Sequence, residues 1–353
     1  MKLFQCQVCD NVLYFENRTC ERCKHRLAYV PELGTLSALE PAAGDTWTAL
    51  AAPDRPGRLC ANADYEACNW LVAPGSEQTF CVACRHNGTI PNVSDPPQRA
   101  AWQQIEVAKH RLFYTLLRWN LPLKTRTEDP AHGLLFDFLS DPPETQGPKV
   151  LTGHDNGLIT IALVEADDVE REKRRKGMGE PYRTLIGHFR HEIGHHYWDV
   201  LVRDGGKLDA CRAVFGDDDQ DYGTALQRHY AEGAPPDWQE HFVSTYATAH
   251  PWEDFAETWA HYLHIVDTLE MASAFGLEVK PRLGGSQDLA VRVDFDPYGA
   301  AGIQPIIDAW LPFVFAMNSV NRAMGNRDLY PFVLSPRVIR KLGFIHDLVH
   351  GQI

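Results

Sequence analysis

The chain has 353 residues, of which 34 are basic and 47 acidic, so its formal net charge is −13, and 44% of its residues are apolar. This length suits two domains, or one large domain with an appendage, and provides enough apolar material for a sizeable core. The acidic balance gives no general attraction to nucleic acid or anionic membranes, although a local patch could bind either. No run of about 18 apolar residues could span a bilayer. We therefore expect neither a membrane nor a nucleic-acid partner.

Cysteine is concentrated near the start of the chain, where eight of the nine cysteines precede residue 85. The stretch from Met1 to Cys6 has no long apolar run, so we expect no signal peptide and a cytoplasmic location. In a reducing compartment, clustered cysteines indicate metal ligands rather than disulfides. Cys211 stands apart from the others, and we expect it to be an ordinary buried or half-buried thiol.

The first cysteine set consists of two Cys-x-x-Cys knuckles, Cys6 with Cys9 and Cys20 with Cys23, separated by ten residues. A short strand is expected between them, within 12–15. Two such knuckles can place four thiolates tetrahedrally around zinc. This pattern predicts a zinc ribbon with a structural zinc ion.

The second set is Cys60, Cys68, Cys81 and Cys84, and only its last pair has the x-x spacing. His86 could replace one of the cysteines as a ligand. We predict a second structural zinc site held by the four cysteines. Structural sites of this kind are closed, so we expect no catalysis from either set.

Residues 1–95 are thus predicted to form a double zinc ribbon, a small β-rich domain that needs such metal staples because its own core is slight. The Gly-, Ala- and Pro-rich stretch 34–56 indicates the loop that joins its two halves. The stretch 87–97, with three prolines, indicates the linker that leaves the domain.

The middle of the chain begins with helical periodicity over 98–119, which predicts a core helix, and 131–139 indicates a second short helix. The β-rich run 156–165 predicts a strand. This strand could be an exposed edge that holds an extended peptide, or it could be interior. The charged run 167–179 indicates a solvated loop or helix end.

The stretch that carries the chemistry reads His191-Glu-Ile-Gly-His195, a His-Glu-x-x-His pattern. We expect it on a helix that begins near Pro181 and ends before Gly205. Positions i and i+4 share a helix face, so both imidazoles can bind one zinc ion. Glu192 points to the neighbouring side, where it can take a proton from a metal-bound water. Three protein ligands would leave a fourth position open for that water.

A third ligand is expected from a helix that opens near residue 251. Glu253, Glu257 and His261 are spaced i, i+4, i+8 and share one face, which would be costly to bury without a cation. The spacing does not choose among the three. Asp199, one turn beyond the second histidine, could orient it or could be a simple exposed carboxylate. The Gly-, Asp- and Pro-rich segment 204–239 predicts a surface loop.

These motifs resemble the zincin metallopeptidases of the gluzincin type, in which a downstream glutamate is the third ligand. The local pattern Glu-x-Phe-Ala-Glu at 253–257 is similar to the catalytic domain of anthrax lethal factor. The whole chain resembles a bacterial family of zinc-binding metallopeptidases that begin with a zinc ribbon. The resemblance implies Glu253 as the metal ligand, Glu257 as the carboxylate that holds a ligand histidine, and Tyr246 as a residue that stabilises the oxyanion.

We therefore predict an α+β fold, with a double zinc ribbon over 1–95 and a zincin-like metallopeptidase domain over 96–353. The predicted function is zinc-dependent peptide hydrolysis with Glu192 as general base, using one catalytic and two structural zinc ions. The expected partners are a peptide or protein substrate and a protein bound through the ribbon. The alternative is a protein- or nucleic-acid-binding module in which the ribbons engage the partner and the zincin domain is an inactive scaffold.

Overall fold

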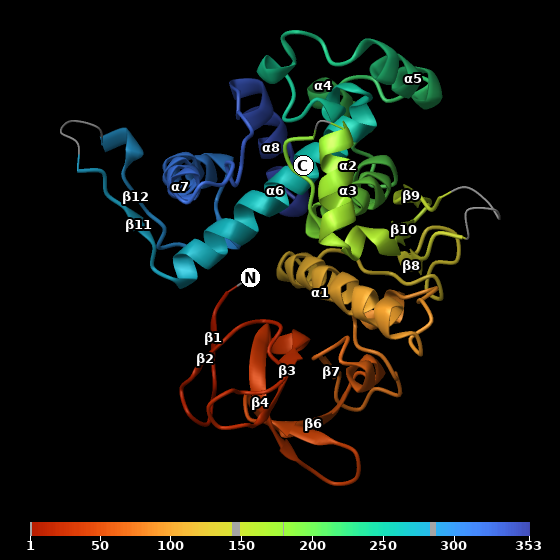
Figure 1. Ribbon diagram of the computed structural model, residues 1–353, viewed down its shortest axis with the longest axis vertical. Coiled ribbons are helices and arrows are strands. Elements are labelled where there is room, and N and C mark those ends of the chain that lie inside the picture. Colours follow the sequence, from red (N-terminus) through yellow and green to blue (C-terminus); the bar gives the residue numbers. More distant parts are fainter. Residues whose placement is uncertain (1, 143–148, 179, 283–286) are drawn as a thin grey trace. The chain divides into compact units, whose positions relative to one another are not determined.

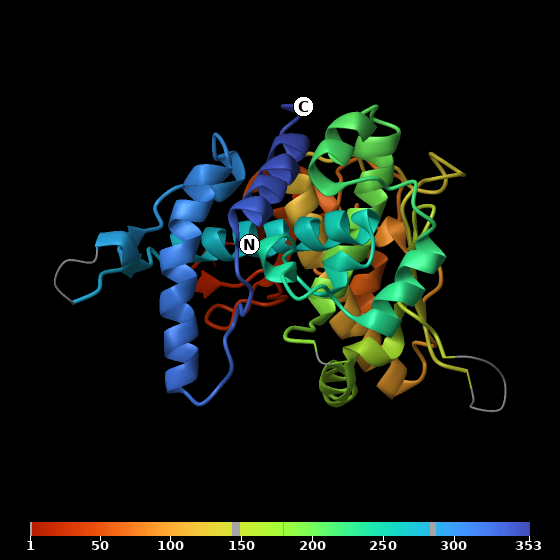
Figure 2. The same cartoon turned by 90° about the horizontal axis from the view of Figure 1, so that it is seen from above.

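The computed structural model describes residues 2–142, 149–178, 180–282 and 287–353 (Figures 1 and 2). By its internal contacts the chain divides into two compact units, Met1–Gly177 (unit 1) and Met178–Ile353 (unit 2). Each unit is described by itself. The domain division at residue 95 stays a prediction.

The ribbon part of unit 1 contains two antiparallel sheets. In the first, β1 (Phe4–Gln5) pairs with β2 (Val12–Leu13), close to the strand expected there. The second is a meander whose strands follow chain order: β3 (Arg26–Val30), β4 (Thr35–Pro41), β5 (Trp47–Ala49), β6 (Ala52–Leu59) and β7 (Leu71–Val72). Its apolar face forms a small core from Ala28, Val30, Leu39, Ala49 and Leu71.

The predicted joining loop over 34–56 is wrong, because most of it is strand. Its small residues pack well on the sheet: Ala38 is fully buried and Ala49 is 1% exposed. Gly34 and Gly44 take positive φ values of 57° and 68°, which lets the chain turn. Composition alone hid these strands, since Ala, Gly and Pro are all depleted in sheets generally.

Helix α1 (Pro96–Arg118) confirms the predicted core helix and packs on the ribbon. Its Tyr114 ring lies 5.4 Å from Phe15 and 6.1 Å from Tyr29, and both of these rings contact Trp70, at 6.0 and 4.7 Å. Rings at such separations and angles attract one another beyond their burial. This aromatic cluster joins the two halves of the ribbon to the helix.

Unit 1 also holds a three-stranded sheet in the order β8 (Leu135–Leu139), β10 (Leu158–Ala162), β9 (Gly153–Asp155). The helix expected over 131–139 is wrong. Alternate residues point to opposite faces of a strand, and Phe136 and Phe138 are buried on one face of β8. Strand β10 is the predicted strand, and it is interior, parallel to β8 and antiparallel to β9. The charged run after it is helix α2 (Asp168–Met178).

Unit 2 is built around one long helix, α6 (Pro251–Ala274), seen lengthwise in Figure 2. The helices that contact it are α3 (Leu185–Tyr197), α4 (Leu208–Phe215), α7 (Ile303–Ala323) and α8 (Pro336–Val349). The unit also contains α5 (Tyr222–Glu232), the π-helical turn η5 (Trp198–Arg203), and a hairpin of β11 (Glu278–Val279) and β12 (Val291–Arg292). Together with unit 1, this confirms the predicted α+β class.

Single 3₁₀ turns complete both units: η1 (Pro31–Leu33), η2 (Ala61–Tyr65), η3 (Cys84–His86), η4 (Leu163–Ala166), η6 (Trp238–Glu240), η7 (Tyr246–Thr248), η8 (Gln287–Leu289) and η9 (Pro297–Gly299). In the part of the chain that the structure describes, every helix is too short or too polar to cross a membrane.

Two expectations for unit 2 are corrected. Helix α3 begins at Leu185 rather than near Pro181, because Thr184 caps it by accepting a hydrogen bond from the Gly187 amide at 3.0 Å. The segment 204–239 is not a loop, since it contains α4 and α5. These helices have only 8 and 11 residues and each is followed by a glycine of positive φ, so the Gly, Asp and Pro residues around them favoured a loop.

Candidate metal centres

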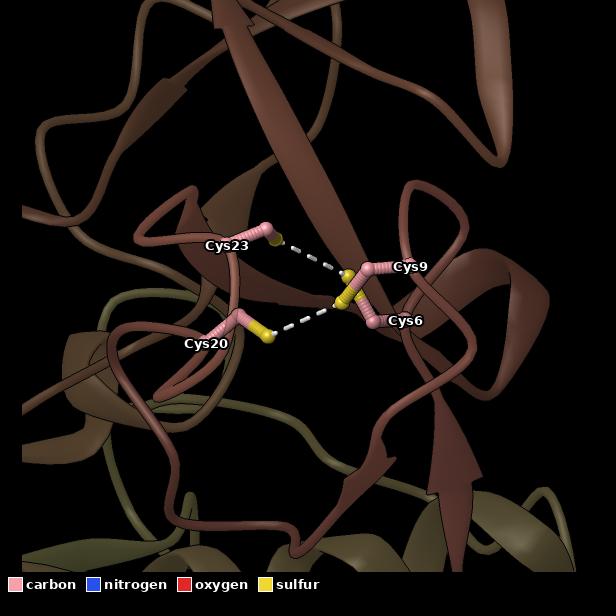
Figure 3. A group of neighbouring side chains, drawn as sticks. All are labelled: Cys6, Cys9, Cys20 and Cys23. Atoms are coloured by element: carbon pink, nitrogen blue, oxygen red, sulfur yellow. Dashed lines mark hydrogen bonds between the residues drawn. The ribbon is translucent and has the colours of Figure 1, made fainter.

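The first cysteine site is formed by the two predicted knuckles, whose four sulfurs point toward one another (Figure 3). Cys6 Sγ lies 3.6 Å from Cys23 Sγ, and Cys9 Sγ lies 3.6 Å from Cys20 Sγ. Thiolates bound tetrahedrally to one zinc at about 2.3 Å lie roughly 3.8 Å apart. These separations therefore fit a zinc ion at the centre of the four sulfurs.

The two knuckles share one backbone geometry. In each, the amide after the second cysteine donates to the carbonyl of the first: Asp10 to Cys6 and Lys24 to Cys20, both at 2.9 Å. Asp10 and Lys24 both take positive φ, 59° and 66°. Residues other than glycine rarely adopt this conformation. The two knuckles of this site therefore share the same turn.

The second cysteine site brings together Cys60, Cys68, Cys81 and Cys84, and all four are buried. Cys68 and Cys81 have their sulfurs 3.8 Å apart. His86, considered above as a substitute ligand, is directed elsewhere: its Nδ1 lies 2.9 Å from the Leu134 carbonyl oxygen. All nine cysteines of the chain are free thiols, so neither cluster is a disulfide pair.

Three residues of α1 face the second cysteine site, and no spacing rule pointed to them. His110 Nε2 lies 3.2 Å from Cys68 Sγ and 3.6 Å from Cys84 Sγ, and Glu106 Oε2 lies 3.8 Å from Cys84 Sγ. Lys109 makes a fully buried ion pair with Glu106 at 2.9 Å. A helix with apolar periodicity thus carries a buried polar turn where it meets the cysteines.

Unit 2 holds the third centre, where α3 crosses α6. Glu253 Oε2 lies 3.0 Å from His191 Nε2 and 3.4 Å from His195 Nε2, and these two Nε2 atoms are 3.2 Å apart. Gly194 allows the helices to approach, because a Cβ at this position would lie 3.0 Å from the Ala256 Cα. Two imidazole nitrogens and one carboxylate oxygen form a donor set suited to zinc.

The other candidates on α6 occupy different places. Glu257 Oε1 lies 2.8 Å from His191 Nδ1, on the far side of the imidazole from Glu253, and Glu257 Oε2 accepts a hydrogen bond from Ser244 at 2.5 Å. Neutral imidazole with a proton on Nδ1 keeps its Nε2 lone pair for a metal. His261 Nδ1 lies 2.7 Å from the Tyr330 hydroxyl. The geometry thus groups Glu253, rather than Glu257 or His261, with the two histidines of α3.

Burial and the nearby carboxylates shift the pKa values of the residues at this centre. Burial would lower the pKa of His191, but hydrogen bonds and charge from Glu253 and Glu257 raise that pKa well above its ordinary value. Burial would raise the pKa of Glu253, but the charge on His195 and hydrogen bonds from both histidines hold it well below its ordinary value. The two carboxylates stay ionised and His191 attracts a proton. A divalent cation would take the place of that proton, so the residues fit a metal.

Two tyrosines and a tryptophan border this centre. The Tyr222 hydroxyl donates to Glu253 Oε1 at 2.6 Å, and the Tyr246 ring lies 5.8 Å from the His191 ring. Burial, followed by the Glu253 charge, raises the pKa of both tyrosines, so their hydroxyls stay protonated and can donate. The Trp252 ring lies 3.7 Å from the His195 ring.

The segment that carries Ser244 and Tyr246 is held from α8. Lys341 Nζ donates to the His241 carbonyl oxygen at 2.7 Å and to Asp254 Oδ2 at 2.6 Å. Asp254 follows Glu253 directly on α6. Lys341 therefore links this segment to the first turn of α6, the helix that carries Glu253 and Glu257.

The last two predicted site residues lie on α3 and on the turn that follows it. Glu192 is 7% exposed, and its charge contributes, after burial and Glu253, to the raised pKa of Tyr222. Asp199 is also 7% exposed and accepts a hydrogen bond from Arg203 at 2.7 Å. It lies in η5, and π-helical turns are frequent at functional sites. Its role in orienting His195 stays a prediction.

Comparison with known proteins identifies the family. Residues 98–348 match the family described as "Putative zinc-binding metallo-peptidase", and residues 3–95 match a zinc-ribbon domain. The chain belongs to this metallopeptidase family. The match confirms the resemblance predicted from the motifs, together with an amino-terminal zinc ribbon.

The chain is similar over nearly its whole length to proteins of two mycobacterial species. Uncharacterized proteins of Mycobacterium bovis and Mycobacterium tuberculosis are each 42% identical to it over 350 residues, which is 99% of this chain and 95% of each relative. No solved structure matches the chain.

Proposed function

We propose that this chain is a zinc-dependent peptidase of the gluzincin type, with His191, His195 and Glu253 as the ligands of a catalytic zinc. The observation that carries the proposal is the convergence of these three ligand atoms from α3 and α6, with Glu192 adjacent to His191 in the sequence of α3. The two cysteine sites would hold structural zinc, so the chain would bind three ions. The cytoplasmic location, a peptide or protein substrate, and a protein partner for the ribbon remain proposals.

Zinc bound at this centre would polarise the substrate carbonyl and lower the pKa of a water molecule. Glu192 accepts the proton that the attacking water loses, as the new C–O bond forms at the peptide carbon. It then delivers that proton to the amine nitrogen as the C–N bond breaks. Glu192 is 7% exposed, so it is largely shielded from bulk water.

The remaining residues position these groups. Glu257, itself held by Ser244, accepts from His191 Nδ1 and so keeps the His191 Nε2 directed toward Glu253. Tyr246 keeps its hydroxyl proton and would donate it in a hydrogen bond to the carbonyl oxygen as negative charge develops there. Tyr222 donates to Glu253 Oε1, which leaves Oε2 facing the two histidines.

The decisive experiment compares wild type with Glu192→Gln on an unbiased peptide library, with bound zinc measured on both. We expect the variant to lose about 10²–10⁴-fold in cleavage rate while its zinc content stays unchanged, because the amide cannot accept a proton. Equal cleavage by both proteins would exclude Glu192 as the base. Absence of cleavage by wild type would favour the alternative, a binding module with an inactive zincin scaffold.

A further inference from the structure

Several aromatic rings border the histidine–glutamate centre of unit 2. The Trp252 ring lies 3.7 Å from the His195 ring, and the Tyr222 ring lies 5.7 Å from Trp252, edge to face. The Tyr246 ring lies 5.8 Å from the ring of His191. Single exposed apolar residues are common on any protein surface, whereas a group of them at one place indicates a binding site. The rings at this centre form such a group.

Helix α5 is held beside this centre at both of its ends. In its first turn, the Tyr222 hydroxyl donates to Glu253 Oε1 at 2.6 Å. Two turns later, His229 Nδ1 lies 3.1 Å from the Thr248 hydroxyl oxygen, and the His229 ring lies 6.1 Å from the Tyr246 ring. Residues i and i+7 lie on the same side of a helix. One face of α5 therefore makes both contacts and forms a wall beside the metal ligands.

Tyr230 follows His229 on this wall and is 71% exposed. Its ring lies 5.7 Å from the His229 ring. Three successive ring contacts thus lead from His191 through Tyr246 and His229 to Tyr230. Partial burial raises the pKa of Tyr230, and the charge of Glu253 raises it further, so the residue lies within electrostatic reach of the centre. Because most of its ring is in water, Tyr230 has apolar surface to offer to a bound molecule.

The charges near Tyr230 indicate which side chain would suit this wall. Glu253 and Glu180 both act on Tyr230, and both already have partners. Glu253 accepts from Tyr222 and faces the two histidines, and Glu180 pairs with Arg183 at 3.1 Å. A basic side chain would find these charges engaged, whereas an apolar or aromatic one would bury its surface against the rings. Tyrosine rings provide that contact area at little cost in conformational entropy.

We propose that α5 is the wall of a substrate subsite, in which Tyr230 selects peptides with an aromatic or large aliphatic side chain near the cleaved bond. The inference rests on the proposed peptidase function and adds the class of substrate. An extended peptide advances about 3.3–3.6 Å per residue. A side chain within a few residues of the cleaved bond can therefore reach Tyr230 while the bond itself lies at the metal ligands.

The first test sequences the products that full-length, zinc-loaded protein makes from the unbiased peptide library. We expect wild type to enrich aromatic or large aliphatic residues about 10-fold at one position near the cleaved bond. Tyr230→Ala should lose this enrichment with unchanged zinc content and Tm, and Tyr230→Phe should keep it, because the ring makes the contact. The matched control is Phe315→Ala, since Phe315 is 54% exposed but lies on α7, outside the centre. Enrichment that survives in Tyr230→Ala, or that disappears equally in the control, would overturn the proposal.

A binding experiment separates the subsite from the peptidase function. The same library is passed over immobilised Glu192→Gln protein, and over the double variant Glu192→Gln with Tyr230→Ala, and the retained peptides are identified by mass spectrometry. We expect the single variant to retain peptides with aromatic or large aliphatic residues about 10-fold better than the double variant.

The two proposals then fail in different ways. Such selective retention, without any cleavage by wild type, would refute the peptidase and support the subsite. Cleavage by wild type without enrichment of apolar residues would refute the subsite and support the peptidase. Equal retention by the single and double variants, or preferred retention of charged peptides, would overturn the subsite.

Discussion

The cysteine sites of unit 1 and the histidine–glutamate centre of unit 2 organise their ligands in opposite ways. The second cysteine site surrounds its four sulfurs with buried groups, down to the helix residues behind them. The centre of unit 2 has three converging ligand atoms and a neighbouring Tyr222 that is 37% exposed. Four ligands close a zinc site, whereas three leave a position for water or substrate. The number of ligands therefore distinguishes the structural zinc sites from the candidate reaction centre.

The largest effect is expected when a ligand is removed from the second cysteine site. Cys81→Ser should cost one zinc per chain and most of the folding energy that metal binding gives a small domain, at least several kcal/mol, so the ribbon should unfold at a much lower denaturant concentration. Cys211→Ser is the matched control, because Cys211 is buried at 3% exposure but lies outside both clusters. Equal loss of zinc in both variants would contradict the assignment of ligands.

Removal of a ligand from the histidine–glutamate centre of unit 2 (the open centre) should leave the fold intact. Glu253→Gln should lower zinc affinity at this centre by more than about 100-fold, since loss of a ligand exceeds the usual effect of losing its supporting group. Retained zinc can be measured by dialysis against graded chelator, followed by elemental analysis. We expect two ions to remain. Release of all three ions would show that the centres are not independent, and retention of all three would exclude Glu253 as a ligand.

Acid should distinguish the units through a buried histidine of unit 2. His346 lies 2.8 Å from the Tyr262 hydroxyl, and burial, helped by His350, lowers its pKa to about 4. A histidine whose folded-state pKa is depressed contributes stability above its unfolded pKa of about 6.5, and this contribution is lost as the pH falls toward 4.

The full contribution of His346 is at most about 3 kcal/mol. His346→Gln should therefore flatten the fall of Tm between these pH values compared with wild type. Acid also releases zinc from both proteins, so the difference between the two curves isolates the histidine. Parallel curves would rule out this source of acid sensitivity.

The smallest expected effects concern the groups that support the open centre. Glu257→Gln should weaken zinc binding about 10–100-fold, because the amide no longer accepts a charge-assisted bond from His191. Ser244→Ala should weaken it less, since the serine acts only on Glu257. Competition with a zinc-selective dye would rank the two variants. A larger loss for Ser244→Ala would contradict the order of contacts described above.

Local patterns accounted for much of the candidate site. His191 and His195 share a face because a helix repeats every 3.6 residues, and the first two Cys-x-x-Cys pairs are followed by the same turn, at Asp10 and at Lys24. Such features are encoded within a few residues of each other. Spacing also brought Glu253 and Glu257 into consideration, but only the crossing of α3 and α6 separates their positions around His191.

Partners from distant parts of the chain could not be predicted. Tyr222 lies on a helix that composition disguised as a loop, and His110 lies on a stripe that looked like ordinary core. Strands β4 to β6 were missed because small residues carry little hydrophobic signal, even though they pack closely on a sheet. Each of these failures reflects tertiary contacts, which override local propensity.

The absence of a side chain at Gly194 sets how closely α3 and α6 approach at the centre of unit 2. In a His-Glu-x-x-His pattern the two intervening positions are chemically free, but here Ile193 is fully buried and Gly194 lies against the α6 backbone. All five positions of the pattern are therefore constrained: three carry the candidate ligands and base, and two are packed in the interior. A larger residue at 194 would push α3 and α6 apart and increase the distances from Glu253 Oε2 to the Nε2 atoms of the two histidines. The choice of ion at this centre would therefore depend in part on the absence of a Cβ atom at position 194.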